Sequence, residues 1–259
     1  MKVSALVVVY NERIIDIACL DRLLAAGVVD QIVICDNSTN KNDNEQIAAE
    51  RNLTYLSMHG NKGLSAAYNV GISHCTGEVI CVFDDDTMIV DGYFEELERV
   101  WHADPNWDIA LPLVLSNGEM LSPVLFDGFR AVPLSSEKKL IGRAQISGIN
   151  SGMAVKAHVF NLVKYDENLF LDLIDHRFCS DALKANLSIA FYPDMVLSQT
   201  YSLSTDSADQ AAKRYSLFKQ DVKTFYSDDF IHAIYGEAMI AYRKARLAMK
   251  YGWRFFTAK

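Results

Sequence analysis

The sequence predicts an α/β fold with a doubly wound, mainly parallel sheet that is flanked by helices and followed by a C-terminal helical tail. Strand-like and helix-like segments alternate through the first ninety residues, which is typical of parallel strands joined by crossover helices. The first strand-like segment, residues 3–10, is an unbroken apolar run, as expected of a strand covered on both faces. From Ser207 onward the pattern is helical and increasingly basic, and this predicts the tail.

The segments that follow residues 3–10 alternate in type. Residues 13–27 carry apolar side chains at helical spacing and end on a glycine, which suits a helix C-cap. Residues 30–39 contain the apolar run IVIC and end on polar residues, and together with residues 53–58 they are expected to be the second and third strands. The polar segment 41–52 between them predicts a short helix.

The chain becomes less regular after its fourth strand. Residues 63–75 have small side chains at helical spacing, and residues 78–86 form the fourth strand. Between residues 107 and 163, apolar runs are interrupted by Gly, Ser, Asn and Pro, which predicts extended segments joined by turns. Residues 168–186 have the pattern of a loop that becomes a helix, and residues 187–197 that of a further strand.

Composition limits both the size of the protein and the kinds of partner it binds. The chain has 259 residues, half of them hydrophobic, enough for one large domain at residues 1–205 with a helical extension at residues 206–259. The net charge of -8 argues against a general nucleic-acid-binding protein. No apolar run reaches 18 residues, so no segment is expected to span a bilayer.

The five cysteines favour a cytoplasmic protein. They form no C-x-x-C pair, their number is odd, and most lie in apolar stretches. This pattern favours buried thiols in a reducing compartment over a zinc site or a disulfide framework. The apolar N-terminus leads directly into the first strand and has no cleavage pattern, so we expect no targeting segment there.

Polar residues follow three of the expected strands. Tyr10 and Asn11 come after the first strand, Asp36 ends the second, and Asp84 to Asp86 end the fourth. Ligands of a doubly wound sheet bind beyond the carboxyl ends of its strands. These side chains could therefore gather along one edge of the sheet.

The three consecutive aspartates have two interpretations. Asp84 and Asp86 alternate along the chain, and two carboxylates with open coordination positions suit Mg²⁺ or Mn²⁺ that also contacts substrate phosphates. Alternatively, the aspartates form a solvated loop before a helix, where negative charge is favourable at the N-terminus. The residues alone leave both open.

Two further groups could carry chemistry. Lys62 and Gly63 begin the helix of small residues, whose N-terminus could bind a phosphate or a sugar hydroxyl; the alternative is tight packing of that helix on the sheet. Asp172 and Asp175 lie in an apolar segment, where burial could raise the pKa of a carboxylate and make it a general base. The alternative for these two is a helix cap with a salt bridge to a nearby cation.

The motifs, taken in order, resemble those of family 2 glycosyltransferases, and most of all bacterial enzymes that transfer rhamnose and related sugars in surface polysaccharide synthesis. The resemblance covers roughly residues 1–205 and rests on VVVYNE, CDN, NKGLSAAYNVGI, FDDDT, SGINSGMAV and FLDLIDHRFCSDALKANLSIAFYPD. It implies a GT-A fold, a D-x-D metal motif that binds Mg²⁺ or Mn²⁺, and an inverting single displacement. The implied donor is a dTDP- or UDP-linked sugar, such as rhamnose or a hexose. The implied acceptor is a saccharide or a lipid-linked saccharide in polysaccharide or O-antigen synthesis.

The resemblance also implies roles for single residues. Asp175 would be the catalytic base, with Asp172 as the second candidate, and Asp84 and Asp86 would hold the metal. The residues implied to bind the nucleotide sugar are Tyr10, Asn11, Asp36, Lys62, Gly63, Asp84, Asp85, Ser151, Gly152 and Gln199.

Two positions depart from the family pattern. Ile174 precedes the expected base where many relatives have glutamate, and Gln199 stands where many have a histidine near the metal. An amide is a poor ligand for a divalent metal, so Gln199 leaves open a non-catalytic protein that binds sugar nucleotides or acts as a scaffold. A nucleotidyltransferase and a redox enzyme are disfavoured because the glycine-rich phosphate loops that they need are missing.

The C-terminal tail combines basic and aromatic residues. These are Arg243, Lys244, Arg246, Leu247, Met249, Lys250, Trp253, Arg254, Phe255 and Phe256. Such a helix suits the anionic inner face of the cell membrane, where a lipid-linked acceptor would lie. The alternative is a helix that packs on its own domain or against another copy in a homo-oligomer.

Overall fold

The structure is a computed structural model that describes residues 1–134, 145–199 and 207–252. The strands are β1 (Val3–Val9), β2 (Val29–Asp36), β3 (Thr54–Ser57), β4 (Val79–Asp84), β5 (Thr87–Ile89), β6 (Ile109–Ser116), β7 (Glu119–Ser122), β8 (Val124–Phe126), β9 (Ala131–Pro133), β10 (Gln145–Ser147), β11 (Met153–Lys156) and β12 (Ile189–Gln199). The α-helices are α1 (Leu20–Ala25), α2 (Asn44–Glu50), α3 (Leu64–Ile72), α4 (Tyr93–Ala103), α5 (Ile174–Lys184), α6 (Ala208–Phe225) and α7 (Phe230–Tyr251).

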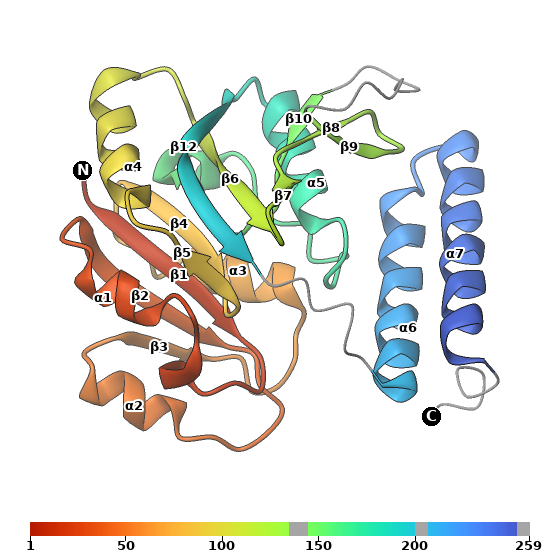
Figure 1. The fold of residues 1–259 in the computed structure, drawn as a ribbon, viewed down its shortest axis with the longest axis horizontal. Helices are drawn as coiled ribbons and strands as arrows, with labels where there is room; N and C mark the ends of the chain where they lie inside the picture. Colours follow the sequence, from red (N-terminus) through yellow and green to blue (C-terminus); the bar gives the residue numbers. More distant parts are fainter. Residues whose placement is uncertain (135–144, 200–206, 253–259) are drawn as a thin grey trace.

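A large mixed sheet forms the centre of the molecule (Figure 1). Its strand order is β3-β2-β1-β4-β11-β6-β12-β5, with β7 paired to β6. The strands β3, β2, β1 and β4 run parallel to one another, and β12 runs parallel to β6. Antiparallel pairs involve β11, β5 and β7. The α/β fold with a doubly wound, mainly parallel sheet is therefore confirmed, with one antiparallel strand, β11, inserted at its centre.

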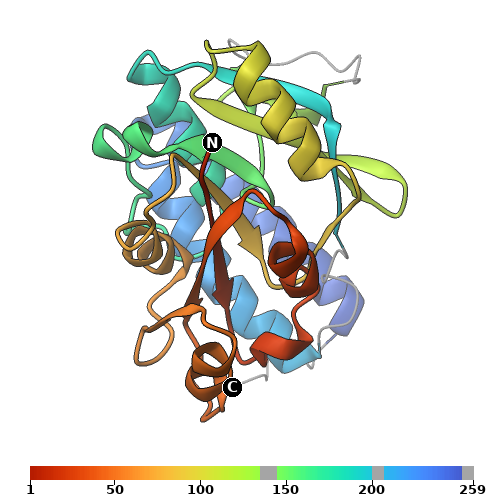
Figure 2. The ribbon, with the colours of Figure 1, turned by 90° about the vertical axis from the view of Figure 1, so that its left-hand side faces the viewer.

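Helices cover both faces of this sheet. Side chains of β1 alternate between two cores: Leu6 and Val8 belong to one, and Ala5, Val7 and Val9 to the other, because successive strand residues point to opposite faces. The first core includes side chains from α3, α5 and α6, and the second includes side chains from α1, α2 and α4. Figure 2 looks from the side of α1 and α4, with α6 and α7 behind the sheet.

The register of the parallel strands decides where the site forms. Val9 of β1 pairs with Asp36 of β2, and Val8 pairs with Asp84 of β4. The carboxyl ends of these three neighbouring strands therefore lie at one edge of the sheet. The polar residues that follow them share that edge.

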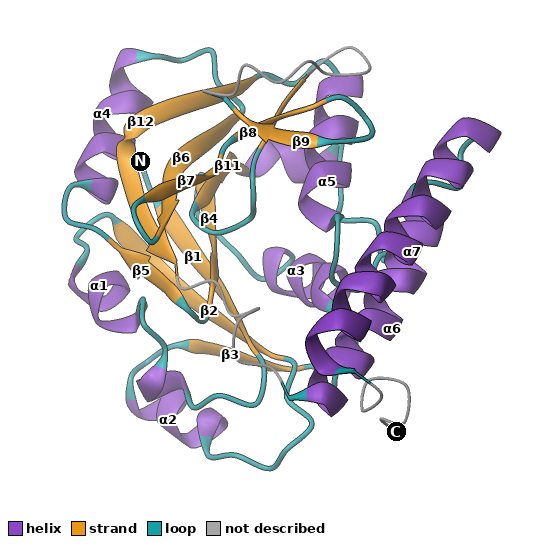
Figure 3. Ribbon diagram, turned by 45° about the vertical axis from the view of Figure 1, so that its right-hand side comes forward, coloured by secondary structure: helices purple, strands orange, loops and turns teal. Residues whose placement is uncertain are grey.

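The C-terminal residues form an antiparallel helical hairpin, α6 and α7, beside the sheet (Figure 3). Each helix begins with a side-chain cap: Ser207 forms a capping box with Gln210, and the carboxylate of Asp229 accepts from the N–H groups of Ile231 and His232. Phe218 of α6 belongs to the same core as the sheet. The predicted helical tail is thus present. The predicted boundary between residues 205 and 206 lies outside the described residues.

Two regions differ from the expectation. The expected helix at residues 13–27 is a 3-10 turn at Ile14–Asp16 followed by α1. Tertiary bonds interrupt it, because Ile14 N donates to the side chain of Asn44 and Ala18 N donates to the carbonyl of Asp85. The middle of the chain contributes strands to two sheets. Strands β6, β7 and β11 belong to the large sheet, and β10, β8 and β9 form a separate three-stranded sheet.

None of the helices in the described ranges is both long and apolar enough to cross a membrane.

Candidate functional site

A cavity of about 630 Å³ opens at the carboxyl edge of the sheet. We call it the central cavity. Its lining comes from the ends of β4 and β12, from the loop and first turn of α5, and from both C-terminal helices. It brings together five residues singled out from the sequence: Asp84, Asp86, Asp172, Asp175 and Gln199.

Asp84 is partly buried and holds a dense set of hydrogen bonds. The Tyr68 hydroxyl donates to its Oδ1 at 2.9 Å, and the Ser151 hydroxyl donates to its Oδ2. Burial raises the pKa of Asp84, while the bonds from Ser151 and Tyr68 oppose that rise. Burial and the nearby Asp84 also raise the pKa of the Tyr68 phenol well above its usual value. Tyr68 therefore stays protonated and donates.

The next two aspartates differ in environment. Burial, followed by the charges of Asp84 and Asp86, raises the pKa of Asp85 to about 6. The backbone of Asp85 is fixed because its carbonyl accepts from Ala18 N at 3.1 Å. Asp86 points its Oδ1 toward the amide of Gln199, whose Nε2 lies 2.9 Å away.

The arrangement of Asp84 and Asp86 fits a divalent cation. The amide nitrogen of Gln199 donates to Asp86 Oδ1 at 2.9 Å and to Asp84 Oδ2 at 3.4 Å, so the two carboxylates face one common point, which this amide occupies and would have to leave for a cation. Within the described ranges there is no group of three or more His, Cys, Asp or Glu side chains that could hold a metal. Mg²⁺ is commonly bound by one or two carboxylates together with substrate phosphates. The two carboxylates fit such an ion when phosphate completes its coordination.

The end of β2 carries a second polar centre, at Asp36. Its carboxylate accepts from the Ser38 N–H, from the side-chain amides of Asn42 and Asn44, and from the Tyr55 hydroxyl. Burial alone would raise the pKa of Asp36, but the bonds from Ser38, Asn44 and Asn42 outweigh it, and the pKa is lowered. Asp36 lines a hollow of about 340 Å³.

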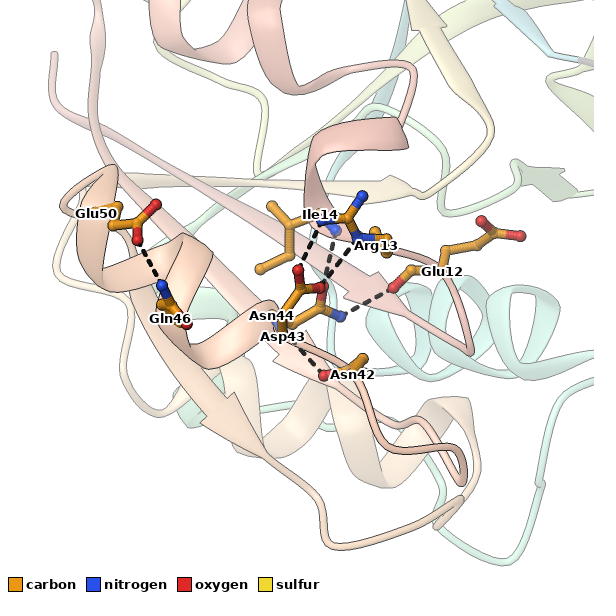
Figure 4. A network of polar contacts seen from close by, with 8 residues as sticks. All are labelled: Glu12, Arg13, Ile14, Asn42, Asp43, Asn44, Gln46 and Glu50. Atoms are coloured by element: carbon orange, nitrogen blue, oxygen red, sulfur yellow. Dashed lines mark hydrogen bonds and ion pairs between the residues drawn. The ribbon is translucent and has the colours of Figure 1, made fainter.

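Asn44 connects this centre to the loop that follows β1 (Figure 4). Its side chain accepts from Ile14 N and donates to the Glu12 carbonyl, both at 2.9 Å. Arg13 forms a two-point ion pair with Asp43 directly beside it. Asn44 is fully buried, so this network fixes the shape of the edge between β1 and β2.

The loop after β1 also meets the loop after β2. Asn11 has a φ of 58°, and its side-chain oxygen accepts from the N–H groups of Thr39 and Asn40, each at 3.0 Å. Tyr10 beside it is 46% exposed and leaves an aromatic face open at this edge.

Lys62 and Gly63 contact the side chain of Asn37, the residue that follows Asp36. The side-chain oxygen of Asn37 accepts from Lys62 N at 2.8 Å. Gly63 has a φ of 90° and caps α3, and a Cβ there would lie 3.0 Å from the carbonyl oxygen of Phe170. Leu64 N donates to that same carbonyl at 2.6 Å. Glycine is therefore required for the loop before α5 to approach α3.

Ser151 and Gly152 contact the end of β4, the strand that leads into the three aspartates. Ser151 is buried and donates to Asp84. Gly152 has a φ of 68°, its N–H donates to the Val82 carbonyl at 2.7 Å, and its carbonyl accepts from the Tyr93 hydroxyl at 2.6 Å. The antiparallel β11 thus presents this turn to the end of β4.

The two candidate bases are in different situations. Asp175 is in the first turn of α5 and lines the central cavity. Asp172 is held by Arg214, whose Nη2 lies 3.0 Å from Oδ1 and whose Nη1 bonds Oδ2, and Arg243 Nη1 lies 3.9 Å from Oδ1. Guanidinium groups therefore occupy both oxygens of the Asp172 carboxylate, whereas Asp175 lines the cavity and makes no such ion pair among the described residues. The geometry therefore favours Asp175 over Asp172.

Two residues of the site, Asp221 and His176, were not singled out from the sequence. Asp221 of α6 is fully buried and accepts from three consecutive backbone N–H groups, those of Phe170, Leu171 and Asp172, at 2.7 to 2.9 Å. His176 lines the cavity, is stacked on Phe126 and lies 2.7 Å from Ser147 Oγ through Nδ1. Asp221 has mostly polar neighbours along α6, so the sequence offered no signal for it.

Comparisons with known proteins show which family and fold this chain resembles. A family model described as Glycosyl transferase family 2 matches residues 4–149, more than half of the chain. A curated relative, the dTDP-rhamnosyl transferase RfbF of Shigella flexneri, is 24% identical over 201 residues, which cover 74% of this chain and 67% of that protein.

Similar solved structures include TarS of S. aureus, with a TM-score of 0.57 and 15% identity over 97% of this chain and 44% of TarS. TarS 1-349 in complex with UDP has a TM-score of 0.56 and 16% identity, covering 96% of this chain and 72% of that one. GalNAc-T7 with UDP, GalNAc and Mn²⁺ has a TM-score of 0.58 and 14% identity, covering 96% and 58%. The chain thus spans less than half of the longer TarS chain. At such identities the likeness shows the fold, which is the expected GT-A fold.

Proposed function

This chain belongs to glycosyl transferase family 2 and is a glycosyltransferase, and we propose that it moves a sugar from a nucleoside diphosphate donor to an acceptor hydroxyl with inversion at the anomeric carbon. The observation that carries the proposal is the central cavity. It contains the convergent carboxylates of Asp84 and Asp86 and, in the same lining, the carboxylate of Asp175. Inverting transfer needs a donor anchored on one side and a base for the acceptor on the other.

The proposed donor is a dTDP- or UDP-linked sugar, rhamnose or a hexose. RfbF is named as a dTDP-rhamnosyl transferase, and TarS and GalNAc-T7 have been solved with UDP. In this proposal the nucleoside lies at the carboxyl ends of β1 and β2, against Tyr10, Asn11 and Asp36, with Lys62 and Gly63 beside it. Asp36, with a lowered pKa, would be ionised and could accept a hydrogen bond from the nucleobase of the donor.

The diphosphate and the donor sugar would occupy the central cavity. Asp84 and Asp86 would hold Mg²⁺ or Mn²⁺, which when bound supplies positive charge that stabilises a leaving diphosphate. Asp85 fixes the turn that presents them. The amide of Gln199 would donate to a phosphate oxygen, and Ser151 and Gly152 would border the donor sugar. Asp175 would accept the proton of the acceptor hydroxyl as that oxygen attacks the anomeric carbon.

A thermal-shift experiment tests the donor site. Because the protein supplies two convergent carboxylates, we expect Mn²⁺ alone to change the melting temperature little and Mn²⁺ with UDP or dTDP to raise it clearly. A ligand at 100 times its Kd stabilises by about 2.7 kcal/mol, which is roughly 5–10 °C for a protein of this size. GDP is expected to have a smaller effect.

Asp86→Asn should remove most of the metal-dependent part of this shift. Asp91→Asn is the matched control, because Asp91 is a neighbouring aspartate whose side chain is 80% exposed and paired with Arg22. An equal shift in EDTA, or in the Asp86→Asn variant, would count against the metal assignment of Asp84 and Asp86.

The proposed acceptor is a saccharide or a lipid-linked saccharide in bacterial polysaccharide or O-antigen synthesis, used at the inner face of the cell membrane. The exposed apolar residues of α7 support membrane contact, since Phe230, Ile231 and Met249 are 80%, 68% and 80% exposed. Four of the tail residues singled out from the sequence, Trp253, Arg254, Phe255 and Phe256, lie outside the described residues. Contact with a second copy of the chain is the alternative use of this face.

Vesicle flotation tests the membrane contact. We expect the full chain to float with vesicles that contain anionic lipid and to remain behind with purely zwitterionic vesicles, because basic residues bind the anionic surface. A chain that ends at Gly252 should float less. If the shortened chain floats as well as the full chain, residues 253–259 have no part in membrane binding.

A further inference from the structure

The two C-terminal helices enclose a second cavity, a groove of about 380 Å³ between α6 and α7. We call it the hairpin groove. Its apolar lining comes from Phe218 of α6 and from residues of α7, namely Met239, Tyr242 and Leu247. Its basic lining is Arg214, Arg243, Arg246 and Lys250, and none of the described residues that line it is acidic.

The hairpin groove and the central cavity share a wall. Arg214 and Arg243 line both. Arg243 packs its guanidinium on the Phe218 ring at 4.1 Å, and both arginines face Asp172, which Arg214 Nη2 reaches at 3.0 Å. The order across this wall is therefore the carboxylate of Asp172, two guanidinium groups, and then the hairpin groove.

We propose that the hairpin groove binds the hydrocarbon chain of a lipid-linked acceptor, with Arg214 and Arg243 binding the phosphate or diphosphate that joins this chain to the sugar. This inference rests on the proposed glycosyl transfer and chooses between its two acceptor classes. Asp175, Arg214 and Arg243 line the same cavity, and the two arginines also line the hairpin groove, so an acceptor with its hydroxyl at Asp175 can extend past them into that groove. A sugar, an anion and a hydrocarbon chain match, in that order, what the protein presents there.

The chemistry of each part supports this order. Guanidinium groups bind phosphate oxygens with paired, charge-assisted hydrogen bonds, and two of them can serve a diphosphate. The carboxylate of Asp172 contacts both arginines and orients them at the border of the two cavities. The apolar residues give an alkyl chain a surface away from water, at a gain that scales with the area covered.

Calorimetric titration with three probes tests the proposal. The probes are farnesyl diphosphate below its micelle concentration, inorganic diphosphate and farnesol. We expect farnesyl diphosphate to bind at least roughly tenfold more tightly than either of the others, because only it contacts both the arginines and the apolar lining. Equal affinity for inorganic diphosphate would show that the groove adds nothing, and equal affinity for farnesol would show that the arginines add nothing; either result overturns the proposal.

Two pairs of variants on α7 locate the binding. Leu247→Ala removes apolar lining, and Met249→Ala removes an exposed apolar side chain outside the groove. Arg246→Gln removes a groove charge, and Lys244→Gln removes the same charge outside the lining. We expect roughly five- to tenfold weaker farnesyl diphosphate binding for the first member of each pair and little change for the second. Equal losses within a pair would indicate binding by general surface charge or apolarity and would overturn the proposal.

The donor shift with Mn²⁺ and UDP, measured on the same preparations, separates this inference from the proposed function and reports on folding. A chain that shows the donor shift but does not bind farnesyl diphosphate retains the proposed function and refutes the hairpin groove. A chain that binds farnesyl diphosphate with the expected pattern of variants but shows no donor shift supports the groove and refutes the donor site.

Discussion

Asp175→Asn is expected to reduce sugar transfer by roughly a thousandfold or more while nucleotide binding is retained. Asp175 lies in the first turn of α5, two residues after the N-cap Leu173, whose φ is 65°, and it lines the central cavity. Asparagine keeps the size of the side chain but cannot take the acceptor proton. The nearby Asp172 is ion-paired with Arg214, so we do not expect Asp172 to take over as the base when Asp175 is replaced.

The measurement is the turnover number with a saturating donor, together with the melting shift that Mn²⁺ and UDP produce. Asp181→Asn is the matched control, since Asp181 lies on the same helix and pairs with Lys184, and it should keep nearly full turnover. Normal turnover in the Asp175→Asn enzyme would rule out Asp175 as the base. Loss of the nucleotide-induced shift would instead mean that the substitution disturbs the whole cavity.

Asp221→Ala is expected to destabilise the protein and to reduce transfer, although residue 221 lies almost fifty positions from the expected base. Its carboxylate is buried and accepts from the N–H groups of Phe170, Leu171 and Asp172. Leaving buried N–H groups without a partner costs about 1–3 kcal/mol each, so we expect a loss of roughly 3 kcal/mol or more in the free energy of unfolding. The loop of residues 170–172 leads into Asp175. Once the loop is no longer held by Asp221, Asp175 should be positioned less well, and the turnover number should fall.

Denaturant unfolding and steady-state kinetics measure the two effects. Asp221→Asn retains one acceptor oxygen and should lie between the wild-type and Asp221→Ala proteins in both. Asp209→Asn changes an exposed carboxylate in the first turn of the same helix and should change either quantity little. If Asp221→Ala were as stable as Asp209→Asn, the three hydrogen bonds would not hold the loop.

Much of the sheet could be predicted because its signals are short-range. The apolar run of β1 and the alternating segments up to β4 specify parallel strands, and parallel strands place their carboxyl ends together. That is why Asp36 and Asp84 could be expected at one edge, and the register opposite Val9 and Val8 has them there. The helix expected at residues 13–27 failed for the opposite reason, since bonds to Asn44 and Asp85 are not encoded in its own periodicity.

The site was only partly visible in the sequence. Asp84, Asp86 and Asp175 stood out because a carboxylate in or directly after an apolar segment is costly to bury without a partner. All three line one cavity. Arg214 and Asp221 did not stand out, since an arginine or aspartate in a long polar helix is ordinary. Their importance comes from where α6 packs.

By itself, the sequence determined the alternating strands and helices, the acidic end of β4 and the presence of a helical tail, because each depends on residues within a few positions of one another. Only the tertiary structure decided that the tail returns to the loop before α5, where Asp221 accepts from the backbone of that loop and Arg214 pairs with Asp172. The physical reason is that a buried carboxylate is stable wherever the fold supplies N–H donors or a cation. Which donors it meets is set by packing between segments about fifty residues apart.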